Sequence, residues 1–209
     1  TRAYIGNAGF GLGQAGDVND FHSYVGWYCG ATLSAYKYRH DLRALADVPS
    51  PTQPMTFTEC VGAYTDELGR MPADGKQVAA SVAWAGNDVD VPEYALGYQA
   101  YLAGQFIEIS RRIRSENPCI AGVMPFTTTA NGWEDATSID DIDFKPIITQ
   151  AYRKSFQPVL LSFANNRPHV YPGDTMRIPV YLVNDDEDGR DISGAVLVWR
   201  LVSTAGKSV

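Results

Sequence analysis

The sequence contains no run of about 18 apolar residues, which is the length that a membrane-spanning helix needs. Positive charge is also scarce, because 17 Lys and Arg stand against 24 Asp and Glu and give a net charge of -7. The densest basic cluster, Arg111, Arg112 and Arg114, ends a strongly helical segment, where cations stabilise a helix C-terminus. Nucleic-acid binding needs a concentrated basic face. We therefore expect neither a membrane nor a nucleic acid as a partner.

Cysteine and histidine are few. The three cysteines, Cys29, Cys60 and Cys119, are widely spaced and embedded in apolar stretches, which favours buried free thiols over a disulfide framework. His40 and His169 have no partner at metal-ligand spacing, so both are expected to be surface or packing residues. We expect no metal site and no cofactor.

Two binding motifs are incomplete. A G-x-G-x-x-G pattern must follow a strand and open a helix, whereas here it runs into an extended segment, so its glycines are expected to shape a loop. A run of Asn and Asp resembles the first half of a calcium loop, but Ala195 stands at the twelfth position, where a bidentate Glu is required, so a solvated hairpin turn is the better interpretation. The residues concerned are Gly11, Gly13 and Gly16 in the first motif, and Asn184, Asp186, Asp188 and Gly189 in the second.

A secretion signal is not recognisable at the start of the sequence. Residues Thr1 to Tyr4 include no initiator Met and do not show a charged and then apolar pattern. We expect the chain to be internal to a longer product.

The composition is that of an ordinary globular protein, with 45% hydrophobic and 20% charged residues. Up to about residue 150 the chain alternates strand-like and helix-like patterns, whereas from about residue 156 it shows only short alternating runs and turn signals. The sequence therefore predicts two domains, residues 1–155 and residues 156–209.

The first domain is expected to belong to the α/β class. Its strands and helices follow one another in turn, and this order implies parallel strands that are joined by crossovers. The expected elements are a strand with its loop at 17–28, a helix at 32–46, a strand at 55–60, a helix at 91–114, a strand at 119–124 and a helix at 144–156.

The helix at 91–114 carries a largely apolar stripe at spacings of three and four, which predicts the face that it buries. Glu108 and Arg112 are four residues apart and are expected to pair on the outer surface. The stripe consists of Tyr94, Tyr98, Tyr101, Gln105 and Ile109.

The second domain is expected to be an all-β sandwich. Three segments, 158–163, 175–183 and 195–202, read as strands, and apolar and polar residues alternate in the last two, as in strands with one core face and one solvent face. About four strands fit into this domain, fewer than the roughly seven of an immunoglobulin-like fold. We therefore expect a partial sandwich.

Candidate catalytic residues gather where strands of the first domain end. Glu59 follows Thr58 at the end of the strand at 55–60, and barrel enzymes place catalytic groups at the C-terminal ends of their strands. Aromatic side chains can stack on sugar rings, while His, Tyr and Asn can hydrogen-bond hydroxyls or orient a carboxylate, so the mixture suits a carbohydrate site. The neighbouring segments supply His22, Tyr24, Trp27 and Tyr28, and then Asn131, Trp133 and Glu134.

Two stretches carry a resemblance to a known family. Val18-Asn-Asp-Phe-His-Ser-Tyr-Val-Gly-Trp-Tyr28, followed by Pro54-Met-Thr-Phe-Thr-Glu59, resembles the sixth and seventh barrel strands of glycoside hydrolase family 2, which includes β-galactosidases and β-glucuronidases. The resemblance covers roughly residues 17 to 165. It implies the C-terminal part of a (β/α)8 TIM barrel, strands six to eight, followed by an immunoglobulin-like domain.

The resemblance also implies roles for single residues. Glu59 matches the nucleophile of a retaining exo-β-glycosidase of the β-galactosidase type, and Tyr24 matches the tyrosine that hydrogen-bonds it. His22 falls where the family has a polar residue that contacts the sugar, and Trp133 resembles the aromatic residue that floors the sugar subsite. Trp27 and Asn131 are further expected substrate contacts.

The chain departs from the family pattern in two places. The loop at 126–133 is not a close match to the usual end of strand eight, and the Asn-Glu pair that carries the general acid/base is missing. We expect the acid/base upstream of Thr1, so the partners are an oligo- or polysaccharide and the N-terminal part of the same enzyme. The alternatives are a non-catalytic carbohydrate-binding protein and a structural β-sandwich interaction module.

Overall fold

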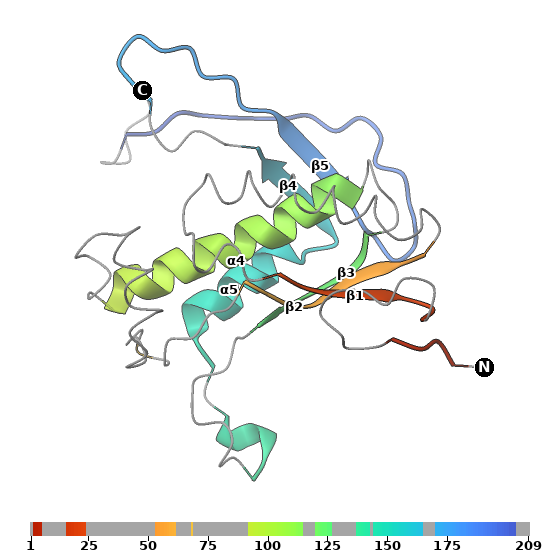
Figure 1. The fold of residues 1–209 in the computed structure, drawn as a ribbon. Helices are drawn as coiled ribbons and strands as arrows, with labels where there is room; N and C mark the ends of the chain where they lie inside the picture. Colours follow the sequence, from red (N-terminus) through yellow and green to blue (C-terminus); the bar gives the residue numbers. More distant parts are fainter. Residues whose placement is uncertain are drawn as a thin grey trace.

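A parallel sheet, a pair of α-helices and a small antiparallel sheet make up the described part of the chain (Figure 1). The structure is a computed structural model, and it describes residues 2–5, 16–23, 53–61, 68, 92–114, 120–126, 137–142, 144–164 and 170–203. Within these ranges, no helix combines the length and the apolar character that crossing a bilayer requires.

The parallel sheet contains three strands, β1 (Asn19–Ser23), β2 (Met55–Val61) and β3 (Ile120–Phe126). They lie in the order β1-β2-β3, and both neighbouring pairs are parallel. The strand positions and their parallel direction agree with the expectation from the sequence. The expected helix at 32–46 lies outside the described residues. Closure into a barrel stays a prediction, because it requires more strands than these three.

Helix α4 (Pro92–Arg114) forms where the sequence predicts a helix, and Ile109 of the expected stripe is buried, but the buried face differs from the stripe at Tyr101. Tyr101 of the expected stripe is 41% exposed, whereas Ala103 and Ile107 are completely buried. The small residue Gly104 allows close approach of the next helix, since a Cβ at this position would lie 3.2 Å from Ser155 Oγ. The expected stripe was therefore wrong at Tyr101, because small and aliphatic residues pack closely while a tyrosine can keep its hydroxyl in water.

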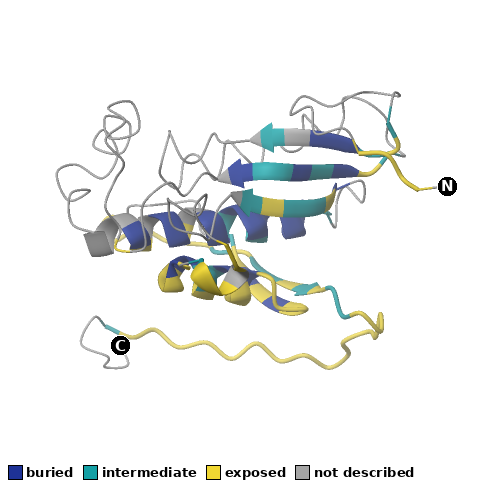
Figure 2. Cartoon of the chain, turned by 90° about the horizontal axis from the view of Figure 1, so that it is seen from below, coloured by how far each residue is buried: buried dark blue, intermediate teal, exposed yellow. Residues whose placement is uncertain are grey.

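The main core lies between α4 and the parallel sheet (Figure 2). Phe57 of β2 and Phe106 of α4 are both buried, and their rings meet edge to face with centroids 5.8 Å apart. Cys60 and Tyr152 belong to the same cluster. The core therefore holds β2 rigidly beneath the helix, which fixes the strand that carries Glu59.

Helix α5 (Pro146–Ser155) packs along α4, with Ile148 and Tyr152 facing the core. Pro146 occupies the first turn, where its missing N–H is not needed. A short 3-10 helix, η4 (Ile139–Asp141), precedes it. The helix expected at 144–156 is thus present with slightly narrower bounds.

The antiparallel sheet follows directly and consists of β4 (Val159–Phe163) and β5 (Val180–Asn184). It covers the C-terminal half of α4, so the expected surface pair of Glu108 and Arg112 is not on the outer surface. Arg112 is only 8% exposed; its guanidinium lies 3.8 Å from the Glu108 carboxylate, and both side chains hydrogen-bond the hydroxyl of Ser162 in β4. Our placement of this pair was wrong because the sequence does not tell which element covers the helix.

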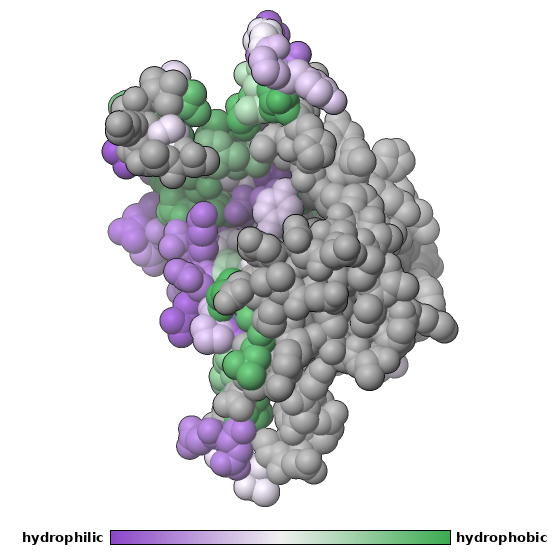
Figure 3. Space-filling model, turned by 90° about the vertical axis from the view of Figure 1, so that its left-hand side faces the viewer, coloured by the Kyte–Doolittle hydropathy of each residue, from purple (hydrophilic) through white to green (hydrophobic). Residues whose placement is uncertain are grey.

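The segment 195–202, together with residue 203, is called the C-terminal arm. The strand expected there is absent, since the arm runs as an extended chain and joins neither sheet (Figure 2). Val198 and Trp199 are 85% and 79% exposed, so both sides of the alternating pattern face solvent. Figure 3 shows hydrophobic side chains gathered in the upper part of one face, where the antiparallel sheet and the arm lie. The sandwich stays a prediction, with two paired strands in the described part of the chain.

Candidate active site

Strands β1 and β2 lie side by side (Figure 1), and their C-terminal halves bring two of the expected site residues together. His22 of β1 is the register partner of Glu59 of β2. Because parallel strands end at the same edge of a sheet, side chains from neighbouring strands meet there. The structure therefore places the candidate nucleophile next to a histidine, as the order of the two motifs predicts.

A β-bulge turns the Glu59 side chain toward His22. Residues 20–22 of β1 lie opposite residues 56–59 of β2, so β2 has one residue more than its partner at this point. Phe57 and Cys60, three residues apart, are both completely buried in the core beneath α4. A regular strand would send them to opposite faces. The extra residue restores Cys60 to the helix side and leaves Glu59 on the side of His22.

The Glu59 carboxylate is held but not enclosed. Its Oε2 lies 3.3 Å from Nδ1 of His22, and the side chains are 33% and 24% exposed, respectively. A substrate can reach a carboxylate of this exposure, while the imidazole limits its rotation. This combination of access and orientation is what a nucleophilic carboxylate needs.

Asp20 is a third member of the site that the sequence reasoning missed. Its side chain is completely buried, and its Oδ1 accepts hydrogen bonds from the Thr58 N–H at 3.1 Å and the Thr58 hydroxyl at 2.6 Å. Its Oδ2 lies 3.5 Å from Nε2 of His22. Asp20 is two residues before His22, so both side chains lie on one face of the strand, and this spacing was the signal that could have identified it.

The other expected site residues lie outside the described residues. These are Tyr24, which is expected to hydrogen-bond Glu59, and the expected substrate contacts Trp27, Asn131 and Trp133. Their proposed roles stay predictions that rest on the resemblance.

Cys60 follows Glu59 in the sequence but has a different environment. Burial raises the pKa of its thiol far above the ordinary value, and the sulfur hydrogen-bonds the Met124 carbonyl at 3.5 Å. A thiol with a raised pKa is a poor nucleophile. Cys60 is a free, buried cysteine, as expected, whereas Cys29 and Cys119 lie outside the described residues.

No cluster of three or more His, Cys, Asp or Glu in the described ranges is arranged to hold a metal ion. His22, Asp20 and Glu59 form a row in which the imidazole stands between two carboxylates. Such a row can orient the carboxylate of Glu59 or transfer a proton.

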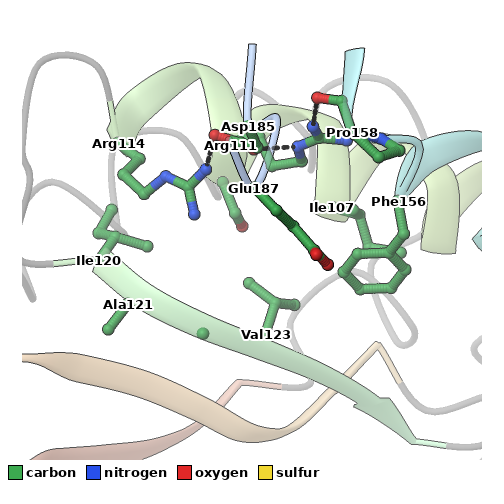
Figure 4. A pocket seen from close by; sticks show the side chains of 12 residues that line it. Ile107, Arg111, Arg114, Ile120, Ala121, Val123, Phe156, Pro158, Asp185 and Glu187 are labelled. Atoms are coloured by element: carbon green, nitrogen blue, oxygen red, sulfur yellow. Dashed lines mark hydrogen bonds and ion pairs between the residues drawn. The ribbon is translucent and has the colours of Figure 1, made fainter. Parts of the chain in front are cut away.

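A pocket of about 360 Å³ lies elsewhere, between α4, the first half of β3 and the chain after β5 (Figure 4). Arg111 and Arg114 both pair with Asp185, and Arg111 also donates to the carbonyl of Pro158 at 3.1 Å. The arginines at the edge of the pocket are therefore paired with Asp185, while the side chain of Glu187 points toward the apolar residues that line the pocket. The pocket is a joint between α4 and the antiparallel sheet, on the helix side of the parallel sheet.

The candidate active site is therefore the edge of the parallel sheet that carries Asp20, His22 and Glu59. Comparisons with protein-family models, with curated proteins and with solved structures found no match to this chain.

Proposed function

We propose that the chain belongs to a retaining β-glycosidase in which Glu59 is the nucleophile. The observation that carries the proposal is the placement of a partly exposed carboxylate at the C-terminal end of the central parallel strand, 3.3 Å from a histidine on the neighbouring strand. The resemblance of residues 17 to 165 to glycoside hydrolase family 2 supports it. The substrate is an oligo- or polysaccharide with a β-linked sugar at its end.

The chemistry follows from a carboxylate at this position. Glu59 attacks the anomeric carbon, the glycosidic oxygen leaves with a proton from a general acid, and a covalent glycosyl-enzyme forms. Water then attacks the same carbon, gives its proton to the conjugate base of that acid and releases Glu59. His22 contacts one oxygen of Glu59 and so limits the rotation of the carboxylate.

A retaining enzyme needs a second carboxyl group about 5 Å from the first. Asp20 contacts the same histidine, but its complete burial excludes it as the group that protonates a leaving oxygen. The resemblance to the family places the acid/base upstream of Thr1, and we propose that the complete site combines Glu59 with that part of the enzyme.

The test is Glu59→Gln in the full-length gene product, with aryl β-glycosides as substrates. Gln has the same shape but cannot form the glycosyl ester, so we expect kcat to fall by about 10³-fold or more while the fold stays intact. Glu187→Gln, at an exposed position in the other pocket, is the matched control and should keep wild-type turnover.

A second measurement identifies the bond itself. An activated 2-fluoro-glycoside, which slows hydrolysis of the glycosyl-enzyme, should add one sugar mass to the peptide that contains residues 55–61. Near wild-type turnover by Glu59→Gln, or a sugar attached to another peptide, contradicts the proposal. Sugar binding without any turnover by the wild-type protein would favour the non-catalytic alternative.

A further inference from the structure

Asp20 is a completely buried carboxylate in β1. Its side chain is 0% exposed, and ionised groups are costly to bury unless they are hydrogen-bonded or paired. Its Oδ1 is well satisfied by the N–H and the hydroxyl of Thr58, whereas its Oδ2 has no hydrogen-bond partner in the described part of the chain. A buried oxygen of this kind calls for a physical explanation.

The unsatisfied oxygen faces the imidazole. Asp20 Oδ2 lies 3.5 Å from Nε2 of His22, while Nδ1 on the other side of the ring lies 3.3 Å from Glu59 Oε2. The first distance is too long for a strong hydrogen bond, so the contact is at most a weak one in this structure. Catalytic hydrogen bonds are often long in a structure without substrate and tighten in the complex.

The other oxygen of Asp20 acts on the strand that carries Glu59. Thr58 is the residue before Glu59 and lies within the bulge, and its N–H points at Asp20 Oδ1 at 3.1 Å. One carboxylate thus contacts both parts of the site, the bulge through Oδ1 and the histidine through Oδ2.

We propose that Asp20 is a positioning residue for the site: it holds the bulge at Thr58 and accepts a hydrogen bond from Nε2–H of His22, and so turns Nδ1–H of the ring toward Glu59. The assignment of an effect on catalysis rests on the proposed function, whereas the orientation of His22 does not. A carboxylate can only accept, so the contact with Nε2 is attractive when that nitrogen carries the proton.

The first test uses the unmodified full-length protein. Labelling with ¹⁵N-histidine gives signals from each histidine, and His22→Gln identifies those of His22. We expect a protonated Nε2 in His22 at neutral pH. A ring protonated only at Nδ1, with a bare Nε2, overturns the proposal.

The second test is Asp20→Asn. The amide oxygen can still accept from Thr58, but the amide NH₂ donates and cannot accept from Nε2 of His22. We expect the His22 signals to move toward an unprotonated Nε2, and kcat for aryl β-glycosides to fall by about 10²-fold, as expected for a misplaced catalytic group. KM should change less than about threefold, because the loss concerns the transition state.

Two further variants separate positioning from general effects. Asp17→Asn removes the same charge from an exposed carboxylate just before β1 and should leave the His22 signals and kcat unchanged. Thr58→Val removes the hydroxyl bond but keeps the backbone N–H bond to Asp20, so it should lower kcat less than Asp20→Asn does and leave the His22 signals unchanged. The proposal is overturned if Asp20→Asn leaves the His22 signals unchanged. It is also overturned if Thr58→Val lowers kcat as much as Asp20→Asn does while its His22 signals stay unchanged.

The outcomes for the two proposals can be told apart. If Glu59→Gln keeps full turnover, the proposed nucleophile is wrong, and the His22 signals in Asp20→Asn still decide whether Asp20 positions the ring. If Glu59→Gln is inactive but Asp20→Asn has wild-type signals and kcat, the nucleophile stands and the positioning role fails.

Discussion

Phe57 and Cys60 lie three residues apart in β2, and both side chains are completely buried on the side of the sheet that faces α4. This is possible because the bulge adds one residue between them. The same residue brings Glu59 to the opposite side, next to His22. Core packing and the direction of the candidate nucleophile therefore depend on one local irregularity.

The packing of Phe57 gives the first prediction. Phe57→Ala removes the ring that meets Phe106 in the core, so we expect a loss of about 3 to 5 kcal/mol in the free energy of unfolding. Phe144→Ala is the control, because Phe144 is 46% exposed and should cost much less. Urea unfolding of the full-length protein measures both. Equal losses in the two variants would show that the Phe57 ring is not a core residue.

The joint between α4 and β5 gives the second prediction. Arg111 is 8% exposed and its Nε lies 2.9 Å from Asp185 Oδ2, so Asp185→Asn leaves a nearly buried cation without its anionic partner. We expect a loss of about 1 to 3 kcal/mol, since Asp185 itself is partly exposed and water offsets some of the change.

Asp188→Asn is the matched control for this joint. Asp188 and Arg190 are 68% and 73% exposed and form a surface pair at 2.8 Å, which should contribute less than about 0.5 kcal/mol. Urea midpoints of the two variants compare them directly. A control variant that is as unstable as Asp185→Asn would contradict the view that the joint is buried.

The parallel sheet and α4 could be predicted from the sequence because both are local or simply periodic. Strand 55–60 is short and lies between prolines on one side and Gly62 on the other, and the helix pattern at 91–114 extends over many turns. The full extent of the face that α4 buries could not be predicted. It depends on Gly104 approaching Ser155 and on the antiparallel sheet that covers Arg112, and both contacts join segments far apart in the chain.

The site was predicted only in part for a related reason. The proximity of His22 and Glu59 follows from two strand ends in a parallel sheet, but a bulge leaves no signal in the residue pattern. Asp20 was missed because an Asp in a strand is by default a solvent-facing residue. In the C-terminal arm the pattern was clear but the predicted element did not form. Its residues alternate as in a strand, yet a strand forms only beside a neighbouring strand.

The loop before α5 gives the third prediction. The Thr137 hydroxyl, then the backbone N–H groups of Thr137 and Ser138, donate to Asp141 and lower the pKa of its carboxyl below the ordinary 3.8. Because the folded pKa is lowered, the contribution to stability is present above the unfolded pKa and is lost as the pH falls. Thr137→Val should raise the pKa of Asp141 in a ¹³C carboxyl titration. Ser138→Ala keeps the backbone donor and should leave the pKa of Asp141 in place.

The buried Cys60 gives the last prediction, a loss of stability in alkali. Burial raises the pKa of its thiol above the ordinary 9.0, so the folded protein keeps the proton that the unfolded chain releases above that pH. The contribution is therefore complete below about pH 9 and is lost progressively as the pH rises. Burial, and then the nearby Cys60, also raise the pKa of Tyr152.

Urea unfolding at about pH 8 and about pH 10.5 tests this prediction. The free energy of unfolding of the wild type should fall between the two pH values, and the fall should be smaller in Cys60→Ala. The cavity that the alanine leaves lowers the stability of the variant at both pH values. The comparison therefore uses the change in the free energy of unfolding between the two pH values, in which this cost cancels. Parallel slopes for the two proteins would mean that the thiol is as accessible in the folded state as in the unfolded chain.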